Sequence, residues 1–189
     1  MTSMLITLSG PSGAGKTTLS AFLKSRYGGS ELPSYTTRPR RQSETSDYYR
    51  FLSGQEYAEL SSRGEFALED EFCNAKYRTR GKDLAIAIHD DKFWIADFTC
   101  ASVIDSIRSG HTPSLALFLY ISKALSQERM RRRGDEESGV QTRIDGYFAE
   151  LETGVQLATL TQAVAFVDAS HALAIVQERI ENAVNSLKR

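Results

Sequence analysis

A glycine-rich stretch near the start of the sequence carries its strongest chemical signal. Residues 10–18 read Gly-Pro-Ser-Gly-Ala-Gly-Lys-Thr-Thr and directly follow the apolar run 4–8. A glycine, four free positions and then Gly-Lys-Thr after a short strand form the pattern of a phosphate-binding loop. Glycines let such a loop turn tightly and point consecutive N–H groups at an anion. The pattern predicts a nucleotide site made by Gly10, Pro11, Ser12, Gly13, Ala14, Gly15, Lys16, Thr17 and Thr18.

Two side chains of this loop are suited to phosphate chemistry. The ammonium group of Lys16 can reach the β- and γ-phosphates and offset their negative charge, and Thr17 offers a hydroxyl to Mg²⁺. The helix that begins here directs the positive end of its dipole at the same phosphates. A nucleotide with bound Mg²⁺ is therefore the predicted ligand.

A second group of basic residues indicates a second anion site. Arg38, Arg40 and Arg41 occupy three of four consecutive positions. Their mutual repulsion is costly unless an anion binds there, and guanidinium groups match phosphate oxygens bidentately. Tyr48 and Tyr49 follow closely, and their hydroxyls can donate to a phosphate without adding charge. A solvated basic loop is the alternative.

The remaining sequence supplies the elements that hold these residues. Apolar runs predict buried strands at 4–8, 93–96, 115–121 and 164–167. Helical spacing predicts helices between them, among them one long helix with Val140, Ile144, Phe148, Leu151 and Val155 on one face. Alternating strands and helices predict an α/β fold with a doubly wound parallel sheet. The polar stretches 33–80 and 131–140 interrupt this rhythm, and they carry the clustered arginines.

Composition limits the possible partners. The 189 residues have a formal net charge of −1, which argues against a general electrostatic grip on nucleic acid or on a membrane. Cys73 and Cys100 lie far apart and outside any metal-ligand spacing, which fits a reducing compartment. No signal peptide or spanning segment is recognisable. We therefore expect a cytoplasmic protein that acts on small molecules.

The order of the motifs resembles that of guanylate kinases over nearly the whole chain. The motifs are Gly10–Thr18, Ser34–Glu44, Tyr49-Arg50-Phe51, Gly64-Glu65-Phe66 with Glu69, Tyr77-Arg78-Thr79, and Arg133-Gly134 with Arg143. The resemblance implies a single domain, 1–189, with the P-loop NTPase fold and a parallel five-stranded sheet. Its core would comprise 1–32 and 81–189, with an inserted NMP-binding subdomain at about 33–80 and a short lid at about 131–143.

The same resemblance implies roles for individual residues. The acceptor phosphate would be held by Arg38, Arg41, Tyr77 and one of Tyr48 and Tyr49. The guanine edge would be read by Ser34, Thr79 and an acid, either Glu69 or Glu71. Asp97 would lie near the acceptor base and the metal, and Asp168 in the adenine-side loop. Arg78 stands where the family has a small glycine, and a bulky cation there could alter recognition of the base or sugar.

The implied activity is direct, in-line phosphoryl transfer from ATP, with Mg²⁺, to GMP or dGMP. The residues expected to offset charge on the reacting phosphates are Lys16, Arg38, Arg41, Arg133 and Arg143. No side-chain base is needed because the acceptor is already an anion, so we expect the three histidines to be structural or exposed. Two alternatives are a kinase of this scaffold for another nucleotide monophosphate or ribose 1,5-bisphosphate, and a non-catalytic interaction module. A monomer or a homodimer fits equally well.

Overall fold

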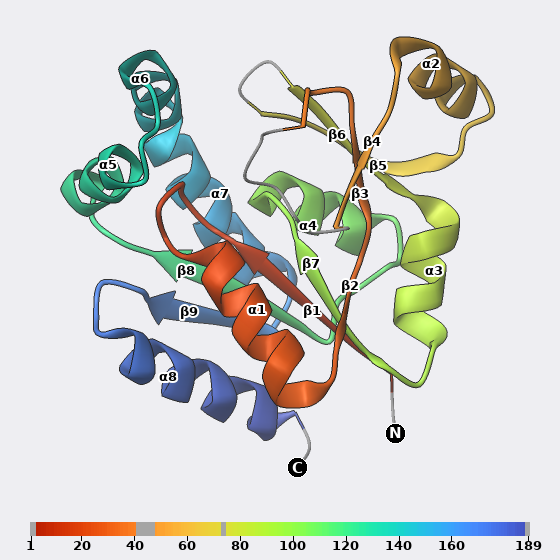
Figure 1. The fold of residues 1–189 in the computed structure, drawn as a ribbon. Coiled ribbons are helices and arrows are strands. Elements are labelled where there is room, and N and C mark those ends of the chain that lie inside the picture. The colour runs from red at the N-terminus through yellow and green to blue at the C-terminus, as the bar shows by residue number, and fades with distance from the viewer. Residues whose placement is uncertain (1–2, 41–47, 73–74, 188–189) are drawn as a thin grey trace.

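The computed structural model describes residues 3–40, 48–72 and 75–187, and it contains two sheets (Figure 1). The larger sheet has five parallel strands in the order β2-β7-β1-β8-β9. These strands are β1 (Met4–Ser9), β2 (Ser30–Glu31), β7 (Phe93–Asp97), β8 (Leu115–Tyr120) and β9 (Val164–Asp168). The predicted doubly wound parallel sheet is confirmed.

Helices cover both faces of the larger sheet (Figure 1). On one face, α1 (Lys16–Tyr27) and α8 (Leu173–Ser186) bury their apolar sides against β1 and β8. On the other face, α3 (Gly81–His89), α4 (Cys100–Arg108) and α7 (Tyr147–Leu160) pack on the same strands. Because the central strands are buried on both sides, β8 is apolar throughout, and only its last residue, Tyr120, is exposed.

The second sheet has four strands in the order β4-β3-β6-β5. They are β3 (Ser34–Thr36), β4 (Tyr49–Phe51), β5 (Phe66–Phe72) and β6 (Ala75–Arg80), and α2 (Gly54–Ser62) connects β4 to β5. A capping box begins α2, since the Ser53 hydroxyl accepts from the N–H of Glu56 and the Glu56 carboxylate accepts from the N–H of Ser53. This cap fixes where α2 begins.

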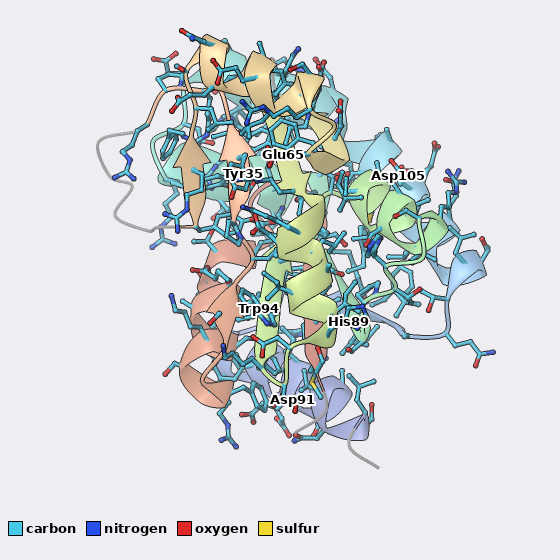
Figure 2. All side chains as sticks on the ribbon, turned by 90° about the vertical axis from the view of Figure 1, so that its right-hand side faces the viewer. Tyr35, Glu65, His89, Asp91, Trp94 and Asp105 are labelled. Atoms are coloured by element: carbon cyan, nitrogen blue, oxygen red, sulfur yellow. The ribbon has the colours of Figure 1, made fainter. Side chains whose placement is uncertain are left out.

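Polar contacts join the second sheet to α3. The Tyr35 hydroxyl donates to Asp83 Oδ2 at 2.9 Å, and Glu65 forms an ion pair with Arg80, directly before the helix. Figure 2 shows Tyr35 and Glu65 together at the α2 end of the molecule, with His89 at the opposite end of α3. The second sheet is thus attached to the larger sheet through a helix that belongs to the core.

One predicted helix is in fact two. The chain forms α5 (Lys123–Arg132), α6 (Glu137–Asp145) and α7, and Gly146 separates the last two. Val140 and Ile144 are buried as expected, whereas Phe148 and Val155 are 60% and 64% exposed. After the break, the buried residues of α7 are Tyr147, Gly154 and Leu157 instead. Among the described residues, no helix is long and apolar enough to cross a membrane.

Candidate active site

A cavity of about 1070 Å³ lies between the two sheets and the phosphate loop. It receives residues from the loop, from the second sheet, from α4 and α7, and from the segment after β9. Both anion sites predicted from the sequence therefore open into one space. The predicted residues that line it are Gly10 to Thr18, Ser34, Arg38, Tyr48, Tyr49, Tyr77, Thr79, Asp97, Arg133 and Arg143.

The loop begins where its backbone passes very close to β8. Gly10 has a φ of 126°, and a Cβ added there would lie 2.0 Å from the carbonyl oxygen of Leu119. Only glycine fits this position. At the other end, Gly15 is the N-cap of α1 and brings no capping side chain. The first amides of α1 thus remain available to phosphate oxygens.

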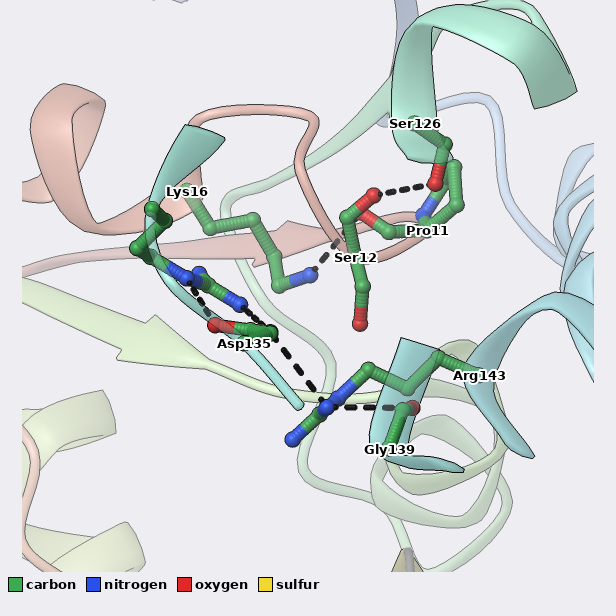
Figure 3. A network of polar contacts seen from close by, with 8 residues as sticks. Pro11, Ser12, Lys16, Ser126, Asp135, Gly139 and Arg143 are labelled. Carbon is green, nitrogen blue, oxygen red and sulfur yellow. Dashed lines mark hydrogen bonds and ion pairs between the residues drawn. The ribbon is translucent and has the colours of Figure 1, made fainter. Parts of the chain in front are cut away.

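Lys16 lies across this loop. Its Nζ donates to the carbonyl oxygen of Gly10 at 2.6 Å. It also donates to that of Pro11 at 3.4 Å (Figure 3). These are neutral partners, so an anionic phosphate in the loop would compete well for the ammonium group. Thr17, the next residue, is exposed and lines the cavity.

The two predicted lid arginines share a carboxylate. Arg133 pairs with both oxygens of Asp135, through Nε–Oδ1 at 2.8 Å and Nη2–Oδ2 at 2.5 Å. Arg143 also donates to Asp135 Oδ2, at 3.3 Å, and to the Gly139 carbonyl (Figure 3). The Asp135 carboxylate is therefore the anion that these two guanidinium groups share.

Helix α5 supports the loop through residues that sequence reasoning missed. The Ser126 hydroxyl donates to the carbonyl of Ser12 at 2.7 Å (Figure 3). Arg129 donates to the carbonyls of Gly13 and Ala169, at 3.1 and 3.0 Å, and so ties the loop to the segment after β9. The sequence does contain one signal for these two residues. Ser126, Arg129 and Arg133 recur at helical spacing, which places them on the same side of α5.

On the acceptor side, the two tyrosines differ in what they contact. Tyr48 is buried, and its hydroxyl donates to the main-chain oxygen of Asp97 at 2.9 Å. Burial raises the pKa values of both Tyr48 and Tyr49, so their hydroxyls stay protonated donors. The Arg38 guanidinium lies 4.6 Å from the centre of the Tyr49 ring. Tyr49 is thus placed beside the arginine, while Tyr48 anchors the segment to β7.

The structure places the predicted acids differently from the expectation. Glu69 does not line the cavity, and its side chain, 56% exposed, pairs with Arg78 at 3.1 Å. Glu71 also lies near Arg78, at 3.9 Å. Asp70 lines the cavity instead. Arg78 also borders the cavity, and its guanidinium donates to the Tyr57 hydroxyl and to the Asp70 carbonyl.

A further carboxylate, Asp97, lies at the end of β7. Burial raises the pKa of the Asp97 carboxyl above its usual value, and the nearby positive charge of Lys16 acts in the opposite direction. Glu31 and Glu150 line the same cavity, and neither was singled out from the sequence. The Glu150 carboxylate accepts from the Cys100 N–H at the start of α4, at 3.4 Å. Glu31 ends β2, an edge strand of two residues that pairs with β7, and so short a strand leaves no pattern in the sequence.

The predicted adenine-side residue Asp168 is close to the cavity without lining it. Hydrogen bonds from Ser170 hold the pKa of Asp168 below its usual value, and His171 lies 3.4 Å away. His171 itself is exposed and lines the cavity, as do Leu173 and the buried Val176. Arg41 lies outside the described residues.

Comparisons with known proteins agree with one another. The protein-family model described as guanylate kinase matches residues 2–189. A guanylate kinase from a Nostoc species is 32% identical over 154 residues, which are 78% of this chain and 76% of the relative. One from Helicobacter pylori is 29% identical over 154 residues, 78% of this chain and 73% of the relative.

A solved structure is similar over almost the full length. The crystal structure of guanylate kinase from Anaplasma phagocytophilum has a TM-score of 0.68 at 19% identity. The match covers 98% of this chain and 86% of that chain. At this identity the likeness shows the fold.

Proposed function

The chain belongs to the guanylate kinase family, and we propose that it transfers the γ-phosphoryl group of ATP directly to GMP or dGMP. One observation carries this proposal. A single cavity contains both the phosphate loop with Lys16 and an arginine–tyrosine cluster, Arg38, Tyr49 and Tyr77. A donor and an acceptor phosphate bound to these two groups would meet without leaving the cavity.

The donor would occupy the loop. Its phosphate oxygens would accept hydrogen bonds from the amides at the start of α1. Their negative charge would also draw the Lys16 ammonium group away from the carbonyls of Gly10 and Pro11. The same negative charge would draw Arg133 and Arg143 away from Asp135. We assign the adenine to the side of the cavity formed by His171, Leu173 and Val176, next to Asp168.

The acceptor would lie under the second sheet. Arg38 and the described tyrosines Tyr49 and Tyr77 would hold its phosphate, and we assign Arg41 to the same phosphate from the sequence. Ser34 and Thr79 lie on the cavity face of this sheet and would contact the base. Tyr48 is assigned to hold β4 against Asp97.

The residues present suit a Mg²⁺ ion that arrives with ATP. Among the described residues, no group of three or more His, Cys, Asp or Glu could hold a metal. That fits an ion which takes most of its ligands from phosphates and water. Thr17 and Asp97 would hold it, since both present hard oxygen donors to the cavity. Bound in this way, Mg²⁺ offsets charge on the β- and γ-phosphate oxygens.

The chemistry requires positioning and charge rather than a side-chain base. The acceptor phosphate is already a nucleophilic anion, so the chain must align it with the γ-phosphorus and offset the repulsion between the two. Lys16, Arg133 and Arg143 would act on the transferring group, and Arg38 with Arg41 on the acceptor. Closure of the second sheet and of α6 would exclude water. We expect the chain to act in the cytoplasm as a monomer or homodimer.

The test is ADP release from ATP and Mg²⁺ with a panel of acceptors: GMP, dGMP, AMP, CMP, UMP, dTMP and ribose 1,5-bisphosphate. We expect rapid turnover with GMP or dGMP alone. Rapid turnover with another acceptor would leave the kinase assignment intact and replace its substrate. ATP binding without transfer to any of them would favour the interaction module instead, and contradict the proposal.

A further inference from the structure

The two faces of the second sheet separate the acids of β5. Side chains alternate along a strand, so Asp70 lies on one face and Glu69 on the other. The register agrees, because Asp70 is opposite Tyr77, which lines the cavity. Glu69 is opposite Arg78, which also borders the cavity but directs its guanidinium to Tyr57 and Glu69. A register irregularity between Phe66 and Leu68 precedes this stretch. Asp70 is therefore the β5 carboxylate that reaches the cavity.

Two hydroxyl groups of α4 fix the orientation of Asp70. Its Oδ2 accepts from Thr99 Oγ1 at 2.5 Å and from Ser102 Oγ at 3.3 Å. Thr99 is also the N-cap of α4, accepting from the Ser102 N–H at 3.2 Å, so its hydroxyl is held as a donor to Asp70. Among the described residues, Asp70 Oδ1 has no hydrogen-bond partner. One oxygen is thus held by the protein while the other is left for a ligand.

We propose that Asp70, held by Thr99 and Ser102, is the residue that selects guanine in the acceptor. The proposal rests on the proposed function and adds to it the group that reads the base. It also explains how Glu69 can be turned away from the cavity without loss of base recognition. Its neighbours Leu68, Thr79 and Ser34 surround the same part of the cavity.

The choice of guanine follows from the donors that each base presents. A carboxylate only accepts hydrogen bonds. Guanine offers two adjacent donors, N1–H and the 2-amino group, to such an acceptor. Adenine and cytosine present an unprotonated ring nitrogen at the corresponding edge, and uracil flanks its single N–H with two carbonyl oxygens. Asp70 would therefore attract guanine and repel the other bases.

A purely structural role for Asp70 is the competing explanation. Its bonds to Thr99 and Ser102 connect β5 to α4, and that alone would justify a carboxylate. The two roles differ in what they predict for inosine monophosphate, IMP, which lacks the 2-amino group of GMP. A structural anchor affects both acceptors alike, whereas a base-reading group affects the ratio of their rates.

The experiment compares kcat/KM for GMP and IMP in the wild type, Asp70→Asn and the matched control Glu69→Gln. We expect Asp70→Asn to lower kcat/KM for GMP about 10- to 100-fold, the usual effect of losing a charge-assisted hydrogen bond. The variant should raise the KM for GMP and leave the KM for ATP unchanged. The ratio of kcat/KM for GMP to that for IMP should come close to one. Glu69→Gln should keep the wild-type ratio.

An unchanged ratio in Asp70→Asn, or a collapsed ratio in Glu69→Gln, would overturn the assignment. If Asp70→Asn does not fold, Ser102→Ala decides, because it removes one of the two hydroxyl donors that orient Oδ2, keeps the Thr99 donor and leaves the carboxylate in place. A GMP-to-IMP ratio lowered several-fold in Ser102→Ala supports the proposal, and an unaltered ratio rejects it. A wild type inactive on every guanine nucleotide would instead remove the proposed function, so the two failures are distinguishable.

Discussion

At Asp97, two neighbouring effects act on one carboxyl group in opposite directions. Burial raises its pKa above the usual 3.8, and Lys16 lowers it by less. Between pH 3.8 and the raised value, the folded state keeps a proton that the unfolded state has lost. The free energy of unfolding therefore falls as the pH rises through that window, and above it the full cost of the buried charge remains.

We predict that Asp97→Asn is more stable than the wild type at neutral pH, because the amide carries no charge to bury. The difference should shrink as the pH falls through the window. Urea unfolding from about pH 4 to about pH 8 measures it for both chains. A difference that grows toward acid pH would show that ionised Asp97 stabilises the fold. Phosphoryl transfer should be weakened in the variant at every pH.

Lys16 is the second residue whose role can be isolated. We predict that Lys16→Ala lowers kcat by about 10³-fold, since no other cation reaches the same loop carbonyls among the described contacts. The midpoint of thermal unfolding should stay close to the wild-type value, because the variant loses only the hydrogen bonds to two neutral carbonyls of the loop. Lys92→Ala, an exposed lysine paired with Asp90, is the control. Equal rates for the two variants would refute the assignment.

At the scale of elements, the turn between α5 and α6 is held by opposite charges. Asp135 pairs with Arg133 and Arg143 where the proposed function requires these arginines to meet phosphate. We predict that Asp135→Asn binds ATP about two- to fivefold more tightly, since the ion pair with Arg133, whose side chain is 54% exposed, contributes under about 1 kcal/mol. Calorimetric titration with ATP measures the change.

Glu137→Gln provides the control for that titration. Glu137 pairs with Arg131, which is exposed and does not line the cavity. Its removal should leave ATP affinity unchanged. Weaker ATP binding by Asp135→Asn would mean that Asp135 orders the two arginines for phosphate rather than competing with it.

The regularity of each strand or helix determined how much of the fold and site could be predicted from the sequence. The core strands were predictable because parallel strands buried on both faces are continuously apolar, as β8 is. The family followed from the phosphate loop and the order of the motifs, and it is confirmed. The cavity face of β5 could not be counted from Phe66, because the irregularity before Leu68 shifts the alternation and brings Asp70 inward in place of Glu69.

The break at Gly146 escaped prediction for a related reason. Apolar residues continue at helical spacing from α6 into α7, so the sequence alone favoured one helix. Tertiary packing decides against it, since Tyr147 is buried and donates to the Ile121 carbonyl at 2.6 Å. Helical spacing puts Arg129 on the same side of α5 as Ser126, but its partners are main-chain carbonyls, which the sequence does not identify.

At the scale of the whole molecule, one cavity joins the donor and acceptor groups. We predict that adenosine linked to guanosine through a polyphosphate chain binds at least about tenfold more tightly than ATP or GMP alone, because linking makes the second binding event intramolecular. Calorimetric titration gives the three dissociation constants. The adenosine–adenosine analogue is the control, since it lacks the guanine edge and should lose most of the gain. Affinity no better than that for ATP would place the two groups in separate sites.

The strand order has a consequence for how the protein is made. Strand β1 lies at the centre of the sheet, yet its partners are residues 93–97 on one side and 115–118 on the other. Gly10 acquires its surroundings only when Leu119 is in place. During translation, β1 therefore leaves the ribosome before both of its partner strands, and its pairing is completed only after β8 has followed. Until then β1 is an apolar segment whose backbone N–H and C=O groups are unpaired on both sides. We therefore expect the nascent chain to bind chaperones.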